Sequence, residues 1–162
     1  MRLTPARASS VNCMPLKYPF VHTLVIVIPD LYLPQEEAAW ASVPYNYGPA
    51  CRRRHTSRIA EDVAQRLAHP FPSEAYSAQL WAARLHNCLG RLSRIKVQAM
   101  IVHGRHDRLI PVANADLIAG RMPHARLEIL EHSGHLYPTE QPDIDEQISA
   151  FIAGCERSDA PG

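Results

Sequence analysis

The chain has 162 residues, of which 46% are hydrophobic and 20% are charged, a balance typical of a folded globular protein rather than a disordered one. Lysine and arginine together number 17 and aspartate and glutamate 16, so net charge gives no argument for a nucleic-acid or membrane-surface partner. The length is sufficient for one modest hydrophobic core.

The cysteines are spaced too far apart for a zinc knuckle or a CxxC redox site; they are Cys13, Cys51, Cys88 and Cys155. The N-terminus lacks the apolar stretch of a signal peptide, and the longest apolar run, residues 24–28, is too short to span a bilayer. We therefore expect reduced thiols, a cytoplasmic location and no membrane partner.

The first third of the chain is rich in proline. Residues 1–20 show neither a helical nor a strand period and are expected to be irregular. Residues 21–28, VHTLVIVI, are typical of a strand covered on both faces in a parallel sheet, and Pro29 ends it. Residues 30–56 are predicted to be mostly loop, with a short helix around residues 35–40.

Two helices are predicted next. Apolar residues at four-residue spacing indicate a helix over residues 57–68. Ser73 is suited to cap a second helix that runs to about Leu89, with Gly90 just past its end.

The last third alternates strands and helices. It contains an apolar strand at 97–103, a helix from Pro111 to about Arg121, a strand at 126–130, and an amphipathic helix that includes residues 144–152. This order predicts an α/β fold with a parallel sheet and right-handed crossover connections.

Two loops at the ends of these strands carry candidate catalytic residues. The sequence HGRHDRLIP begins where the first strand ends, and EHSGHLYP follows the second. Because catalysis in open α/β sheets occurs at the carboxyl ends of the strands, Asp107 and His135 are expected to lie within hydrogen-bond reach. A carboxylate fixes the tautomer of a histidine, and the other ring nitrogen can then act as a general base. The glycine near each residue is expected to permit a sharp turn.

Other interpretations of these residues remain open. Asp107 could be a turn residue or a helix cap, and His135 could be a solvated loop histidine. Two HxxH patterns leave a metal site as an alternative; they are formed by His103 with His106 and by His132 with His135.

The pair HGRHDRLIP and EHSGHLYPTEQP resembles the last two strand–loop units of the α/β-hydrolase family, over residues 97–153. The resemblance implies Asp107 as the catalytic acid and His135 as the base. It implies no cofactor and no metal, and a small-molecule acyl substrate for the intact relative.

The resemblance also implies a domain layout. Residues 21–29 would be a core strand and residues 30–96 a helical cap. Residues 97–153 would be the C-terminal part of a parallel α/β-hydrolase sheet, and residues 154–162 a tail.

The nucleophile motif of that family, G-x-S-x-G, should precede Val21 and does not occur in this sequence. The serines considered as substitutes lack its glycines or fall in or beside predicted helices; they are Ser9, Ser10, Ser57, Ser73 and Ser93. We therefore expect a truncated, serine-hydrolase-like chain with an incomplete triad, whose intact relative cleaves ester- or amide-type acyl bonds. The alternative is a non-catalytic pseudoenzyme fragment, or a half-domain that needs a partner and self-associates through an exposed sheet edge.

Overall fold

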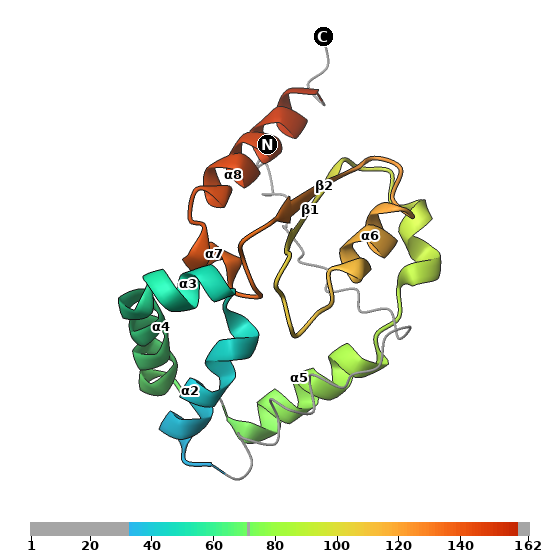
Figure 1. The fold of residues 1–162 in the computed structure, drawn as a ribbon. Coiled ribbons are helices and arrows are strands. Elements are labelled where there is room, and N and C mark those ends of the chain that lie inside the picture. Colours follow the sequence, from blue (N-terminus) through green and yellow to red (C-terminus); the bar gives the residue numbers. More distant parts are fainter. Residues whose placement is uncertain (1–32, 71, 159–162) are drawn as a thin grey trace, which may run out of the picture.

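The computed structural model describes residues 33–70 and 72–158; the predicted irregular segment and the strand at 21–28 lie outside this range. The described chain has a helical first part and a strand–helix–strand–helix second part (Figure 1). The first part consists of α2 (Gln35–Asn46), α3 (Pro49–Arg54), α4 (Thr56–Ala68), α5 (Ser73–Leu85) and the 3-10 helix η1 (Leu89–Arg94). The second consists of β1 (Ala99–Gly104), α6 (Ala113–Ala119), β2 (Ala125–Leu130), α7 (Tyr137–Glu140) and α8 (Ile144–Ser158).

The strands β1 and β2 pair in parallel, with Ala99 opposite Ala125 and Gly104 opposite Leu130. Helix α6 connects them and packs on both. In Figure 1, α6 and α8 lie on opposite sides of the two strands. The predicted α/β order is therefore present, and both strands deliver their following loops to the same edge of the sheet.

The prediction of mostly loop over residues 30–56 is wrong for its described part, because α2 continues past Trp40 to Asn46 and contains Pro44, and α3 follows it. The buried residues of α2 are small (Ala38, Ala39 and Ser42), so they give little hydrophobic periodicity. Packing against α3 and α4 supports the helix instead.

Helix α5 ends earlier than predicted. Its N-cap position is Pro72, Ser73 is its first residue, and it stops at Leu85, so that Gly90 falls inside η1. The chain leaves the helix because Cys88 and Leu92 are buried against Met122. Helix α8, in contrast, continues to Ser158, into the segment predicted as a tail.

Buried apolar side chains form two clusters. The first lies among the helices of the first part, and Leu136 from the second part packs on it; its buried members are Ala39, Tyr47, Cys51, Ile59 and Val63. The second joins η1 to the strands; it consists of Cys88, Leu92 and Met122, with Ala99 and Ala125 packed against them. The residues around η1 therefore share a core with the strands, although they precede residue 97.

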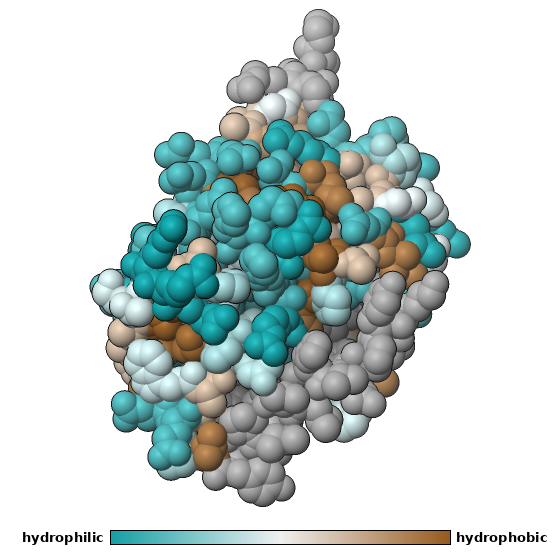
Figure 2. All heavy atoms as spheres, viewed as in Figure 1, coloured by the Kyte–Doolittle hydropathy of each residue, from teal (hydrophilic) through white to brown (hydrophobic). Residues whose placement is uncertain are grey.

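The thiol of Cys51 is free, whereas Cys88 is disulfide-bonded, so the expectation of reduced thiols does not hold for Cys88. Spacing along the chain does not report which cysteines come close in space. Within the described residues, no helix combines the length and the apolar character that crossing a bilayer requires. Figure 2 shows hydrophobic side chains at several separate places among hydrophilic ones on the visible face.

Candidate active site

Asp107 and His135 are in contact beyond the carboxyl ends of the two strands. Nδ1 of His135 lies 2.9 Å from Oδ2 of Asp107. The acid comes from the loop after β1 and the histidine from the loop after β2. The contact predicted from the sequence is therefore present, although 28 positions separate the two residues.

The Asp107 carboxylate is held from two directions. Its Oδ1 accepts the backbone N–H groups of Leu109 and Ile110, each at 2.8 Å, while Oδ2 faces the imidazole. The side chain is 5% exposed, so these hydrogen bonds compensate for its removal from water. Asp107 thus serves as a turn residue with one oxygen and as the histidine's partner with the other. It is not the cap of α6, whose N-cap is Val112.

This geometry sets the proton position on His135. An ionised carboxylate can only accept a hydrogen bond, so Nδ1 must carry the proton that it donates to Asp107. In the neutral imidazole, Nε2 is then the unprotonated nitrogen and has a lone pair available. The imidazole is 34% exposed, which leaves it accessible to a reacting group.

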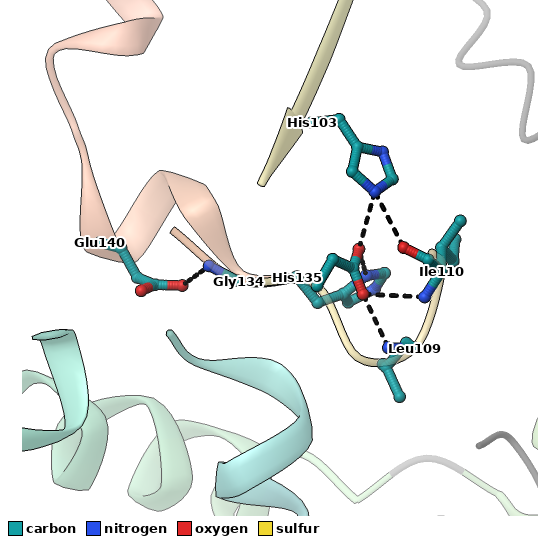
Figure 3. A network of polar contacts seen from close by, with 7 residues as sticks. His103, Leu109, Ile110, Gly134, His135 and Glu140 are labelled. Carbon is teal, nitrogen blue, oxygen red and sulfur yellow. Dashed lines mark hydrogen bonds and ion pairs between the residues drawn. The ribbon is translucent and has the colours of Figure 1, made fainter. Parts of the chain in front are cut away.

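A second histidine lies beside the same carboxylate (Figure 3). Nε2 of His103 lies 2.9 Å from the carbonyl oxygen of Ile110 and 3.6 Å from Oδ2 of Asp107. Because the carbonyl is an acceptor, Nε2 of His103 carries a proton and donates it. The sequence offered His103 only as a possible metal ligand, since the local pattern does not show that the loop folds back over the strand end.

Gly104 and Gly134 are needed for space and not for an unusual backbone angle. No described residue has a positive φ angle. The two glycines are therefore not required for the sharp turns that the sequence suggested. A Cβ atom on Gly104 would overlap the carbonyl oxygen of Gly134 and lie 2.6 Å from that of Ser133. A Cβ atom on Gly134 would lie 2.7 Å from the backbone nitrogen of Gly48. The two loops and the α2–α3 connection therefore pack backbone against backbone.

Glu140, at the end of α7, joins this contact. Its Oε1 accepts the N–H of Gly134 at 2.6 Å and its Oε2 accepts the N–H of Gly48 at 2.9 Å. Burial raises the pKa of this carboxyl group, and the two backbone N–H groups and the charges of His106 and Arg52 oppose that rise. Nothing in the local sequence pattern singles out this glutamate.

A second carboxylate links the helical part to the same region. Asp62 on α4 accepts hydrogen bonds from the hydroxyl groups of Tyr47, at 2.7 Å, and Thr139, at 2.8 Å. Burial, followed by the interaction with Asp62, raises the pKa of Tyr47. Tyr47 is a buried member of the first apolar cluster.

The remaining sequence candidates do not converge on this site. His106 and His132 are exposed, and within residues 33–70 and 72–158 no group of three or more His, Cys, Asp or Glu side chains could hold a metal ion. Ser57, Ser73 and Ser93 lie within α4, α5 and η1, respectively. Ser9 and Ser10 lie outside the described residues.

Curated relatives match part of this chain, and each match covers less than half of the relative. No protein-family model matches the chain. Over 97 residues, 59% of this chain, it is 31% identical to "Putative carbamate hydrolase RutD" of Pseudomonas syringae pv. syringae. That match spans 38% of the relative, so the chain covers little more than a third of its length.

Two solved structures resemble the described fold. An esterase from Thermogutta terrifontis superposes with a TM-score of 0.66 at 19% identity, over 83% of this chain and 49% of that one. Rv0554 from Mycobacterium tuberculosis superposes with a TM-score of 0.70 at 20% identity, over 84% of this chain and 51% of that one. At these identities the likeness concerns the fold, and this chain spans about half of each solved protein.

Proposed function

We propose that this chain, which has the C-terminal part of the α/β-hydrolase fold, supplies the acid and the base of a hydrolase that acts on ester- or amide-type acyl bonds. In this proposal Asp107 orients His135. Nε2 of His135 accepts the proton of a nucleophile and later returns it to the leaving group. The supporting observation is the 2.9 Å contact between the two side chains, made by a carboxylate whose other oxygen is already held by two backbone N–H groups.

The surroundings of Asp107 suit this task. The imidazole becomes positively charged when it accepts a proton, and the adjacent carboxylate stabilises that charge. Because the carboxylate side chain is only 5% exposed, water screens this attraction less than it would at the surface. The relative from Pseudomonas syringae supports the same chemistry, since its name describes a carbamate hydrolase.

The reaction also requires a nucleophile and backbone donors for the oxyanion. The sequence contains no G-x-S-x-G motif, and the described serines at 57, 73 and 93 lie in helices. We propose that a polypeptide segment with such a motif provides both groups to His135. A small molecule with an acyl bond is the proposed substrate, and no cofactor is required.

The proton position on His135 provides a direct test. Nitrogen-15 NMR of the purified chain should show the Nδ1–H tautomer, with Nε2 unprotonated. Asp107→Asn should shift the population away from this tautomer, because an amide can also present its NH2 group to Nδ1. Asp143→Asn, at an exposed carboxylate, is the matched control and should leave the tautomer unchanged. An Nε2–H tautomer in the unmodified chain would overturn the proposal.

Reactivity tests the acyl chemistry. A haloketone should alkylate His135 at Nε2, the nitrogen not engaged by Asp107. The chain should also release p-nitrophenolate from p-nitrophenyl acetate faster than His135→Gln does. Equal rates for these two proteins would reject a role for His135 in acyl transfer.

A further inference from the structure

The segment 45–48, at the junction of α2 and α3, contacts both loops of the candidate site. The carbonyl oxygen of Asn46 accepts the N–H of Leu136 at 2.9 Å, immediately after His135. The guanidinium of Arg108, immediately after Asp107, lies 4.7 Å from the centre of the Tyr45 ring. One short segment of the helical part therefore touches the neighbours of the acid and of the base.

The carboxylate of Glu140 fixes the closest of these contacts. Its two oxygens receive the N–H groups of Gly48 and Gly134, so one side chain holds the two backbones together. Hydrogen bonds from backbone N–H groups to a carboxylate are among the stronger ones in proteins. Figure 3 shows Glu140 directed toward Gly134, the residue before His135.

The glycines explain why a single carboxylate can reach both N–H groups. A Cβ atom on Gly48 would lie 2.5 Å from the carbonyl oxygen of His132, and one on Gly134 would lie 2.8 Å from that of Asn46. Real Cβ atoms do not approach backbone atoms so closely, so any larger residue would separate the two backbones. The absence of a Cβ atom therefore allows the backbones of Gly48 and Gly134 to approach each other, and the hydrogen bonds to Glu140 hold them together.

We propose that Glu140 is a positioning residue for His135. By fixing the Gly134 backbone against segment 45–48, it holds the imidazole at the distance from Asp107 that the hydrogen bond requires. This inference rests on the proposed function, in which His135 is the base. It assigns to segment 45–48 the role of a fixed support for the histidine loop.

The test uses the full chain and two readouts at His135, the Nδ1–H tautomer and the rate of haloketone alkylation at Nε2. Glu140→Ala removes both acceptors. We expect loss of the single tautomer and alkylation slower by about ten- to a hundredfold, since misplacement of a reacting group by about 1 Å can have an effect of this size. Glu131→Gln is the matched control, because Glu131 begins the same loop but pairs with Arg105 at the surface. It should leave both readouts unchanged.

Glu140→Gln covers the case in which the alanine variant does not fold. Glutamine keeps one acceptor oxygen but places an NH2 group against the other backbone N–H, so an intermediate rate is expected. Wild-type tautomer and alkylation rate in both Glu140 variants, whatever their stability, would overturn the positioning role. If Asp107→Asn changes neither readout while the Glu140 variants change both, the proposed acid–base pair fails, and Glu140 supports the histidine loop without acting through Asp107.

Discussion

His103 and Asp107 face each other across the start of the loop after β1, which we call the acid loop. Nε2 of His103 lies 3.6 Å from Oδ2 of Asp107 and 2.9 Å from the carbonyl oxygen of Ile110. The same loop residue, Ile110, donates its N–H to the other carboxylate oxygen, Oδ1. His103 therefore donates a hydrogen bond to the carbonyl oxygen of Ile110, and the N–H of Ile110 donates one to the carboxylate of Asp107. The shape of the acid loop depends on a side chain that precedes it on β1.

Replacement of His103 tests this dependence. His103→Phe leaves the carbonyl of Ile110 without its donor, and we expect a loss of about 1–3 kcal/mol in the free energy of unfolding, as for a buried polar group that loses its partner. His103→Gln keeps a donor and should lose less. Urea unfolding of the three proteins measures the difference. A phenylalanine variant at least as stable as the glutamine variant would contradict this role.

The close backbone contacts of Gly104 predict that any larger side chain at this position lowers the stability of the fold. Gly104→Ala places a Cβ atom against the backbone oxygens of Gly134 and Ser133, which cannot rotate away as a side chain would. We expect destabilisation of about 1–3 kcal/mol or more. Gly90→Ala is the matched control, because nothing lies within 4 Å of a Cβ atom there. Thermal unfolding should separate the two variants, and similar midpoints would show that the loops can move apart at little cost.

The raised pKa of Tyr47 predicts that the free energy of unfolding depends on pH in the alkaline range. Burial and Asp62 raise its pKa above the ordinary value of 10.0, so the folded state retains the phenolic proton more strongly than the unfolded state. The stability that this provides is present below the unfolded pKa and is lost as pH rises through the folded pKa. The advantage of the wild-type chain over Tyr47→Phe, about 1 kcal/mol near neutral pH, should therefore fall above a pH of about 10. Urea unfolding from neutral to alkaline pH measures this difference, and a constant difference would contradict the prediction.

The chain by itself should not react as a serine hydrolase. An acyl-enzyme route requires an activated nucleophile on a strained turn and donors for the oxyanion, in addition to the histidine and the acid. We expect no stoichiometric labelling by a fluorophosphonate probe, monitored by intact-protein mass spectrometry. Labelling of a serine that disappears in His135→Gln would reveal a resident nucleophile, with Ser9 and Ser10 as the first positions to examine.

Local patterns were sufficient to predict the strand–helix–strand unit of the second part of the chain. Apolar strands separated by a helix of crossover length predict a parallel pair, and a parallel pair places the loops after both strands at one edge. That reasoning brings Asp107 to His135 without any knowledge of the contacts between them. It was less successful for α2, whose buried side chains are small, and for α5, whose end is set by the burial of Cys88 and Leu92 elsewhere.

The sequence by itself determined the α/β order and the meeting of the acid with the histidine, because both follow from periods of a few residues and from the geometry of parallel strands. Only the tertiary structure decided what supports that pair. Glu140 reaches Gly48 across 92 positions, and Asp62 reaches Thr139 across 77. Contacts of this span leave no periodic trace in the sequence, since they depend on how separately formed elements pack and on which backbones can approach without a Cβ atom between them.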